Sequence, residues 1–352
     1  MWKPLFDRFN IHIDFAHRTF RWDSEASSKA HVHCVIVGFS VAPNSKQRRL
    51  YSSERMQLAD NINAYLLPTS NLFVESRTKS LCDVPQMIYG NKPTDGGFLF
   101  LSPSEKEDLL SKEPTSNKFV KQILGAEEYI NNKERYCLWL VGASPADLRG
   151  LPLVMSRIEQ VRSFRANSTK EATRRSADTP TLFQEIRQPS TEYIIVPRVS
   201  SETRKYVPMG FMNPEIIVND AVQIIPNASL YHFGILTSNI HMAWMRAVCG
   251  RLETRYRYSK DIVYNNFPWP TPTEEQKAKI EQTAQAILDA RALYPDCSLA
   301  DLYDEVTMPP ELRKAHQQND KAVMQAYGFD VKTMTESTCV AELMKMYQEL
   351  TK

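Results

Sequence analysis

The alternation of hydrophobic and polar side chains predicts a β-rich beginning, a mixed middle and a helical end for this chain. Residues 10–15 alternate as a half-buried strand does, and residues 30–39 alternate first and then become continuously apolar, like a buried strand. Residues 20–25 are expected to form a polar turn between them. These strands have no earlier partner in the chain, so residues 1–40 are expected to be the last strands of a domain whose main part lies upstream.

The following hundred residues mix both patterns. Residues 53–67 predict a short helix or a loop, and residues 136–141 predict a strand. Residues 102–111 are expected to be helical, because Ser104 and Glu107 have the spacing of a capping box.

Beyond residue 150 the pattern changes from a helix to short strands and back to a helix. Residues 152–170 predict a helix, whose apolar side carries Leu153, Ile158, Val161 and Phe164. Four short segments with β-branched residues and turn residues around them predict a small curved sheet over 193–197, 206–211, 215–219 and 222–225. Residues 230–249 have apolar side chains at helical spacing, and Gly250 is expected to end that helix.

A proline-rich stretch over residues 265–272 is the clearest boundary in the chain. After it, Thr273 and Gln276 have the spacing of a capping box and predict a helix to about Leu293. Further helices are predicted from Ser298, over 309–328 and over 336–350. The predicted fold class is α+β, with the terminal strands of a truncated domain over 1–40, a mixed α/β domain over 41–265 and a helical domain over 272–352.

Composition places the chain among ordinary globular proteins. Hydrophobic residues make up 42% and charged residues 24% of the 352 residues, which is unlike a disordered chain. The net charge of +2 excludes a uniformly basic protein but permits a local basic surface. No apolar run approaches the ~20 residues of a membrane span, and the six cysteines lie too far apart for zinc spacing. We expect a cytoplasmic protein with reduced thiols and no membrane partner.

Several kinds of catalytic or metal site lack support in the sequence. His31 and His33 share a strand face, but zinc needs about four ligands, so packed strand histidines are the better interpretation. The chain has no G-x-S-x-G elbow and no cysteine in a known nucleophile signature. A glycine-rich cofactor turn is absent too, and Phe267 stands where a methyltransferase loop would need proline. This chain alone is therefore expected to have no catalytic residues, no metal and no cofactor of its own.

The positive signal is the distribution of basic residues. Residues 157–205 contain ten Lys and Arg against six Asp and Glu, and residues 246–260 contain five against one. In the second stretch, arginines alternate with tyrosines from Arg255 to Tyr258, which suits phosphate contacts combined with stacking. A solvated, charge-rich surface with no partner is an equally simple interpretation of composition alone.

A series of sequence blocks resembles the MmeI-like family of fused restriction-modification proteins and their methyltransferase-only relatives. The resemblance runs in order over nearly the whole chain. The blocks are residues 13–22, 30–39, 125–130, 135–139, 157–162, 199–206, 242–244, 250–252, 257–259 and 264–270.

The resemblance implies that this chain corresponds to the end of a longer order of domains. Residues 1–40 would be the terminal strands of a truncated methyltransferase-like domain, residues 41–265 a DNA target recognition domain and residues 272–352 a helical C-terminal domain. In that family an endonuclease, a helical spacer and a methyltransferase domain precede a target recognition domain and a helical C-terminal domain. The donor-binding and catalytic motifs precede the region that this chain resembles, so S-adenosylmethionine belongs to the parent adenine-specific methyltransferase. The implied partners are double-stranded DNA and the missing methyltransferase domain or subunit. The resemblance also implies a prokaryotic protein that is associated with the nucleoid in the cytoplasm.

The resemblance and the basic stretches together give a set of candidate DNA contacts. The loop over residues 200–204 lies between predicted strands, where side chains can reach base edges; the alternative is a structural turn in which Glu202 pairs with an arginine. Phe267 and Trp269 are expected to pack the linker onto the recognition domain. The candidates are Arg157, Arg162, Arg165, Arg174, Arg175, Glu202, Arg204, Lys205, Arg251, Arg255, Arg257 and Lys260.

The predicted function is sequence-specific recognition of duplex DNA for a restriction-modification or anti-phage methyltransferase. A scaffold that docks other subunits without reading a sequence is the first alternative, and sequence preference in DNA binding separates the two. An enzyme in its own right is the second alternative, and saturable binding of the methyl donor would favour it. A truncated reading frame with no independent role is the third.

Overall fold

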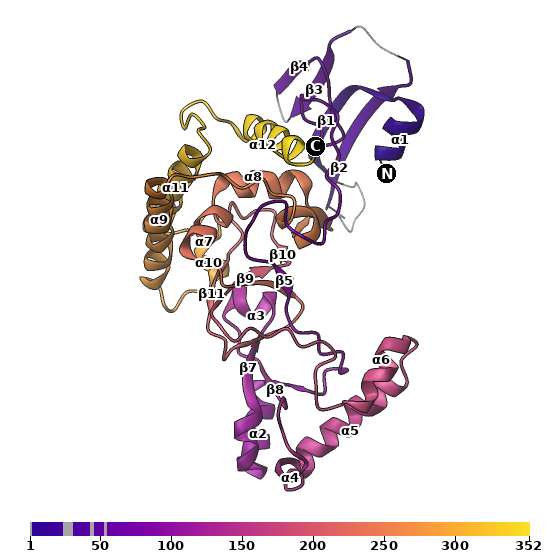
Figure 1. The fold of residues 1–352 in the computed structure, drawn as a ribbon, viewed down its shortest axis with the longest axis vertical. Helices are drawn as coiled ribbons and strands as arrows, with labels where there is room; N and C mark the ends of the chain where they lie inside the picture. The colour runs from indigo at the N-terminus through magenta and orange to yellow at the C-terminus, as the bar shows by residue number, and fades with distance from the viewer. Residues whose placement is uncertain (1, 24–30, 43–45, 53–54) are drawn as a thin grey trace.

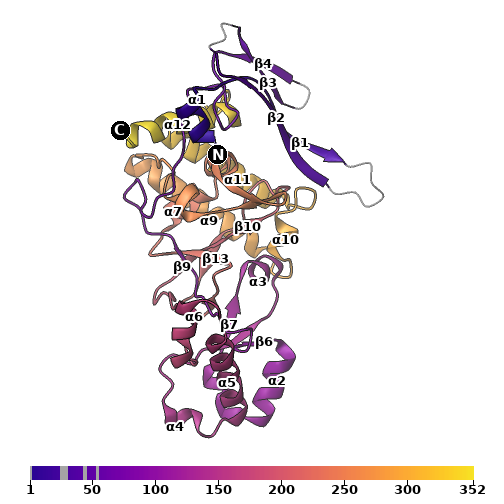
Figure 2. The same cartoon turned by 90° about the vertical axis from the view of Figure 1, so that its right-hand side faces the viewer.

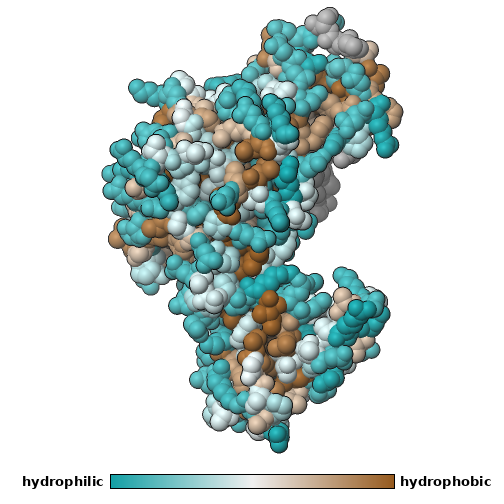
Figure 3. All heavy atoms as spheres, viewed as in Figure 1, coloured by the Kyte–Doolittle hydropathy of each residue, from teal (hydrophilic) through white to brown (hydrophobic). Residues whose placement is uncertain are grey.

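The computed structural model describes residues 2–23, 31–42, 46–52 and 55–352, and it has the α+β fold expected from the sequence. Figure 1 shows three tiers along the longest axis: an N-terminal sheet, a large middle tier that includes the C-terminal helices, and a smaller lower tier. Figure 3 shows apolar side chains gathered on parts of the surface of all three tiers. In the described part of the chain, no helix combines the length and the apolar character that crossing a membrane requires.

The upper tier is a four-stranded sheet beside helix α1 (Trp2–Phe9). Its order is β2-β1-β3-β4, and only the β1–β3 pair is parallel. The strands are β1 (His12–Asp23), β2 (His31–Ser40), β3 (Arg48–Ser52) and β4 (Arg55–Ala59).

Two expectations for this region are corrected by the sheet. The turn expected from Phe20 is wrong as far as Asp23, because β1 continues through these residues in register with β2; residues 24 and 25 lie outside the described residues. Part of 53–67 is strand β4 rather than helix or loop, because residues 55–59 pair with β3. The sheet thus continues past residue 40, since β3 pairs with β1 directly.

The lower tier is a second four-stranded sheet, of order β12-β7-β8-β6, with helices on it (Figure 2). Its buried core includes Leu99, Leu138, Val154, Ile158 and Val161. Its elements are β6 (Phe100–Leu101), α2 (Pro103–Lys112), a 3-10 helix (Pro114–Phe119), β7 (Val120–Leu124), β8 (Tyr136–Leu138), α4 (Pro145–Leu148), α5 (Pro152–Ala166), α6 (Glu171–Arg175), a 3-10 helix (Ser176–Asp178) and β12 (Ile217–Val218). Between β7 and β8, helix α3 (Ala126–Asn131) packs Tyr129 and Ile130 against Tyr193 and Ile195 of the middle tier.

Sequence patterns locate these helices well but miss their details. The capping box of α2 is formed by Ser102 and Glu105, two residues before the predicted pair. The Ser102 hydroxyl accepts from the Glu105 amide, and the Glu105 carboxylate accepts from the Ser102 amide. On α5 only the central two of the predicted apolar residues are buried, since Leu153 and Phe164 are 38% and 44% exposed. The helix also ends at Ala166, four residues early.

The middle tier contains the third four-stranded sheet and most of the C-terminal helices. The sheet order is β11-β9-β13-β5, and a separate three-stranded sheet has the order β10-β15-β14. The strands are β5 (Ile88–Tyr89), β9 (Tyr193–Pro197), β10 (Val199–Ser200), β11 (Gly210–Met212), β13 (Val222–Pro226), β14 (Gly250–Leu252) and β15 (Arg255–Arg257).

The single helix expected over 230–249 is wrong. It is divided into α7 (Leu230–Leu236) and α8 (Asn239–Val248). Ser238 causes the break, because its hydroxyl donates to the Ile235 carbonyl and accepts from the His241 amide, so it caps the second helix.

The C-terminal helices agree closely with the sequence pattern. The capping box of Thr273 and Gln276 is present, with both of its hydrogen bonds. The helices are α9 (Glu274–Ala292), α10 (Leu299–Leu302), α11 (Pro310–Ala326) and α12 (Glu336–Leu350).

The proline-rich stretch lies inside the core rather than on the surface. Phe267 is fully buried and Trp269 is 6% exposed, which confirms that both pack against other apolar side chains. The same continuous core joins Trp244 on α8 to Ile280 on α9 and Leu343 on α12. The C-terminal helices therefore share one hydrophobic core with the strands of the middle tier.

Candidate nucleic-acid interface

A short loop over residues 201–205 joins β10 to the segment before β11. The hydroxyls of Ser201 and Thr203 lie 2.8 Å apart, and the amide of Arg204 donates to the Ser201 carbonyl at 3.3 Å. These local bonds make the loop a compact turn, here called the 201–205 loop.

Three predicted DNA contacts lie on this loop. Glu202 and Arg204 are half-buried, and Lys205 is exposed, with its ammonium 5.4 Å from the Tyr206 ring centroid. Burial lowers the pKa of Arg204, while the nearby carboxylate of Asp304 opposes that change. The loop therefore carries one acidic and two basic side chains, and of these three only Lys205 is exposed.

Strands β14 and β15 form a hairpin over residues 250–257, here called the 250–257 hairpin. Arg255 and Arg257 are exposed on one face, whereas Tyr256 between them is 7% exposed and faces inward. This is the alternation expected of a strand with one buried face. The turn places Glu253 at a φ of 55°, a left-handed conformation that few non-glycine residues adopt.

The hairpin arginines differ in how they are held. The guanidinium of Arg251 lies 3.9 Å from the Tyr256 ring centroid and donates to the Thr254 carbonyl at 2.8 Å. Arg255 pairs with Glu253 at 2.8 Å. Among the residues that the structure describes, the side chain of Arg257 has no hydrogen bond or ion pair, so it is available to an external anion.

The register of the small sheet brings the loop and the hairpin together. Val199 pairs with Arg257 and Ser200 pairs with Tyr256. The 201–205 loop therefore leaves β10 directly beside the arginine strand, and two basic segments that are 45 residues or more apart in sequence share one sheet.

Lys260 is less available than the sequence suggests. Its side chain is 15% exposed, and its ammonium lies 2.6 Å from a carboxylate oxygen of Asp261.

Arg198 is a further basic residue beside this sheet, and sequence reasoning did not select it. Its guanidinium lies 4.9 Å from the Tyr89 ring centroid and donates to the Asp220 carbonyl. The sequence could not predict the contacts of Arg198 with Tyr89 and Asp220, because the pairing of the strands brings these residues together.

Two of the predicted contacts on α5 have structural roles instead. Arg165 is fully buried, and its guanidinium donates to five backbone carbonyls. Reaching DNA would leave those five acceptors unpaired, so we exclude Arg165 from the interface. The acceptors are Pro93, Thr94, Ser176, Thr179 and Leu182.

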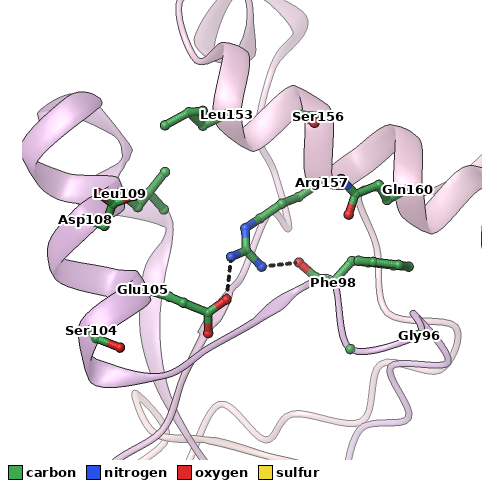
Figure 4. Close-up of a pocket in the computed structure, with 11 residues that line it drawn as sticks. Gly96, Phe98, Ser104, Glu105, Asp108, Leu109, Leu153, Ser156, Arg157 and Gln160 are labelled. Atoms are coloured by element: carbon green, nitrogen blue, oxygen red, sulfur yellow. Dashed lines mark hydrogen bonds and ion pairs between the residues drawn. The ribbon is translucent and has the colours of Figure 1, made fainter.

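Arg157 joins α5 to α2 and to the strand before it, as Figure 4 shows. It pairs with Glu105 at 2.8 Å and donates to the carbonyls of Phe98 and Phe100. Backbone bonding from Ser102 and the pair with Arg157 lower the pKa of Glu105 to about 2. A cavity of about 770 Å³ lies here, but the carboxylates of Glu105 and Asp108 line it, so it does not suit a phosphate.

The other predicted contacts of the lower tier are surface arginines with local partners. Arg162 pairs with Glu159 at 3.3 Å, and Arg175 pairs with Glu171. Arg174 donates to two backbone carbonyls of the preceding turn at 2.9 Å each. Exposed pairs of this kind contribute about 0–1 kcal/mol and exchange readily for phosphate, so these three residues stay predictions.

A residue that sequence reasoning missed holds the end of the loop. Arg246 on α8 makes two contacts with the carboxylate of Glu336, at 2.7 and 3.0 Å, and donates to the carbonyl of Lys205 at 3.2 Å. The partners are 41 and 90 residues away in sequence, so no local pattern could have found them.

The described residues contain no group of three or more His, Cys, Asp and Glu side chains arranged to hold a metal ion. His17, which lies near the strand histidines in sequence, stacks on Tyr51 with ring centroids 4.3 Å apart.

The 250–257 hairpin and the 201–205 loop thus lie side by side at one small sheet, which makes them the candidate nucleic-acid interface of this chain. Three models of MmeI domains match this chain, one after another along the sequence. They are the MmeI DNA-methyltransferase domain over residues 1–52, the MmeI target recognition domain over 68–271 and the MmeI C-terminal domain over 272–352. The chain belongs to the MmeI family, and it carries that family's target recognition domain.

Two relatives extend this result. The chain is 38% identical over 351 residues to DNA methyltransferase A of Bacillus subtilis (strain 168), covering 100% of this chain and 40% of that protein. It also matches the structure of the type IIL restriction-modification enzyme MmeI in complex with DNA, with a TM-score of 0.92 and 45% identity over 99% of this chain. That match covers 47% of the MmeI chain, so the present chain spans less than half the length of either relative.

Proposed function

We propose that this chain binds duplex DNA and reads a short sequence on behalf of an adenine-specific DNA methyltransferase of a restriction-modification system. The observation that carries the proposal is the shared sheet of the 201–205 loop and the 250–257 hairpin. The solved MmeI structure to which the chain is similar is a complex with DNA, which supports the same function.

The two segments suit different parts of a DNA site. Arg255 and Arg257 are exposed guanidiniums on a strand, and such side chains neutralise phosphates and make binding dependent on salt. The 201–205 loop instead presents Glu202, Arg204 and Lys205, whose acceptor and donor groups match cytosine and guanine edges in the major groove. We assign phosphate contact to the hairpin and base contact to the loop.

The upper tier supports a further part of the proposal, namely that the rest of a methyltransferase domain covers this sheet. One face packs Ala16 and Leu50 into a small core. The other face exposes Phe15, Ile36 and Leu58 by 40%, 46% and 49%. The family model for the methyltransferase domain matches only this end of the chain, and S-adenosylmethionine would bind in the remainder of that domain.

The first test is selection of bound duplexes from a randomised pool by the 352-residue chain, at low and then moderate salt. Enrichment of one asymmetric motif is the expected result. Salt-sensitive binding without enrichment would favour the scaffold interpretation, and absence of binding would refute DNA recognition by this chain.

Matched variants connect the selected motif to the two segments. Arg257→Ala is expected to weaken binding to selected and unselected duplexes alike, whereas Arg204→Ala is expected to reduce discrimination among bases. Arg149→Ala is the control, because Arg149 is an exposed arginine outside both segments. Equal effects of Arg204→Ala on all duplexes would contradict the assignment of base contact to the loop.

A further inference from the structure

The downstream end of the 201–205 loop is bound to the C-terminal helices. Tyr206, the residue that follows the loop, is 2% exposed, and its hydroxyl donates to Asp320 on α11 at 2.7 Å. Its ring stacks on His316, one turn earlier on the same helix, with centroids 4.1 Å apart and planes 19° apart. This single tyrosine is thus held both through its ring and through its hydroxyl.

Asp320 also joins the loop to α8. Its second carboxylate oxygen accepts from the backbone amide of Asn239, the first residue of α8, at 2.8 Å. The residue is 6% exposed, so both of its bonds lie in the protein interior. Buried polar groups with two partners fix geometry, because losing either bond leaves an unpaired group in the core.

Two further contacts hold the backbone on either side of Tyr206. Arg246 donates to the Lys205 carbonyl while its guanidinium is paired with Glu336 on α12. Arg291 on α9 donates to the Met209 carbonyl at 2.5 Å and also to the hydroxyl of Tyr303 at 2.9 Å. Tyr303 in turn is hydrogen-bonded to His316 at 2.8 Å.

Apart from Arg246 and Asn239 on α8, these anchors come from the C-terminal part of the chain. His316, Asp320 and Glu336, like Arg291 and Tyr303, lie in the region that the C-terminal domain model matches, beyond residue 271. We infer that the C-terminal helices take part in sequence recognition. Asp320 is a positioning residue that holds the 201–205 loop in its conformation through Tyr206 and does not itself contact DNA. The inference rests on the proposed function of the loop.

The test compares two tyrosines that differ in their relation to the loop. Tyr206→Phe removes one hydroxyl that bonds to Asp320 and leaves the ring on His316. Tyr327→Phe is the control, because that hydroxyl makes a bond of similar length, 2.8 Å, to the carbonyl of Pro268 and has no role in the loop. A merely structural effect would appear in both variants alike.

Two readouts are measured on the 352-residue chain. Hydrogen exchange over residues 199–209 is expected to accelerate about tenfold in Tyr206→Phe and to keep its rate in Tyr327→Phe. The ratio of Kd values for a single-base variant and for the selected duplex is expected to fall about three- to tenfold in Tyr206→Phe only. The salt dependence of binding should stay the same in both variants.

Asp320→Asn is the second variant. It should fold even if Tyr206→Phe does not, because it keeps the side-chain volume and an oxygen that accepts from the Asn239 amide. Its amide nitrogen then faces the Tyr206 hydroxyl, which can accept from it in place of donating to a carboxylate, so a smaller loss of discrimination than in Tyr206→Phe is expected. Unchanged exchange over 199–209, or unchanged discrimination, in both Tyr206→Phe and Asp320→Asn would overturn the inference. If the unmodified chain itself fails to discriminate between duplexes, the proposed function fails, and the inference fails with it.

Discussion

The 201–205 loop and the 250–257 hairpin lie on the same three-stranded sheet but are held in different ways. The loop is followed at once by Tyr206, which is bonded and stacked on buried side chains of α11. The hairpin is held by the pairing of β15 with β14 and with β10, by the burial of Tyr256, and by local contacts such as that of Arg251 over Tyr256. The difference matches two physical tasks, since base contacts need fixed donors and acceptors while phosphate contacts tolerate movement.

The largest expected effect is on the anchored side of this comparison. Asp320→Ala leaves the Tyr206 hydroxyl and the Asn239 amide buried without their acceptor. At about 1–3 kcal/mol for each of these two unpaired buried groups, the free energy of unfolding should fall by about 2–6 kcal/mol. Urea unfolding measures this decrease, and a value below about 1 kcal/mol would contradict the anchored description of the loop.

A second prediction uses the ionisation of the same carboxyl group. Burial raises the pKa of Asp320 from 3.8 to about 6. The folded state therefore binds this proton more tightly than the unfolded state, so the contribution of Asp320 to stability falls as the pH rises from about 4 to about 6.

The measurement for that prediction is the difference in unfolding free energy between the unmodified chain and Asp320→Asn at about pH 4.5, 5.5 and 6.5. Between pH 4.5 and 6.5 the unmodified chain should lose about 2 kcal/mol of stability relative to the variant. A difference that does not change with pH would show that Asp320 titrates as it does in the unfolded chain.

On the hairpin side, the combined change Arg255→Ala with Arg257→Ala should act on affinity and leave the fold intact. Both side chains are exposed, so the unfolding free energy should change by less than about 0.5 kcal/mol. The plot of log binding constant against log salt should become shallower by about 1 for each phosphate that is no longer neutralised. An unchanged slope in fluorescence anisotropy titrations would remove these arginines from the interface.

The smallest effect is expected for Glu253→Gln, at the turn of the hairpin. This change removes the partner of Arg255 in an exposed ion pair, which is worth about 0–1 kcal/mol. DNA binding should become slightly tighter, because Arg255 loses a competing carboxylate. Weaker binding in the same titration would mean that the pair orients Arg255 for contact.

The sequence predicts local features of this fold well and distant contacts poorly. The capping box of Thr273 and Gln276 lies within four residues, and the structure confirms it together with the helix that follows. Arginine counts, by contrast, treat Arg165 and Arg255 alike, although the first is fully buried and the second is exposed. Arg165 is buried because the segment over residues 93–94 and the turn over residues 176–182 fold around it and supply five carbonyl acceptors.

The candidate interface shows the same limit. The resemblance identifies the block that contains Glu202 and Arg204, but the bond between Tyr206 and Asp320 joins residues 114 positions apart. The break at Ser238 escapes the sequence pattern for a related reason, because the apolar spacing of residues 230–249 continues across it while a hydroxyl and the carboxylate of Asp320 satisfy the new helix start.

The buried course of residues 265–272 has a consequence for how specificities can be exchanged between relatives. A chimera joined within this stretch would combine Phe267 and Trp269 from one parent with core helices from another, and it would also separate Tyr206 from its own Asp320. Recombination that preserves function should therefore transfer the strands and the C-terminal helices as one cassette. If the 201–205 loop contacts bases as proposed, single substitutions on it should change specificity, whereas an exchange of the whole unit should have its junction before residue 68, where the match to the target recognition model begins.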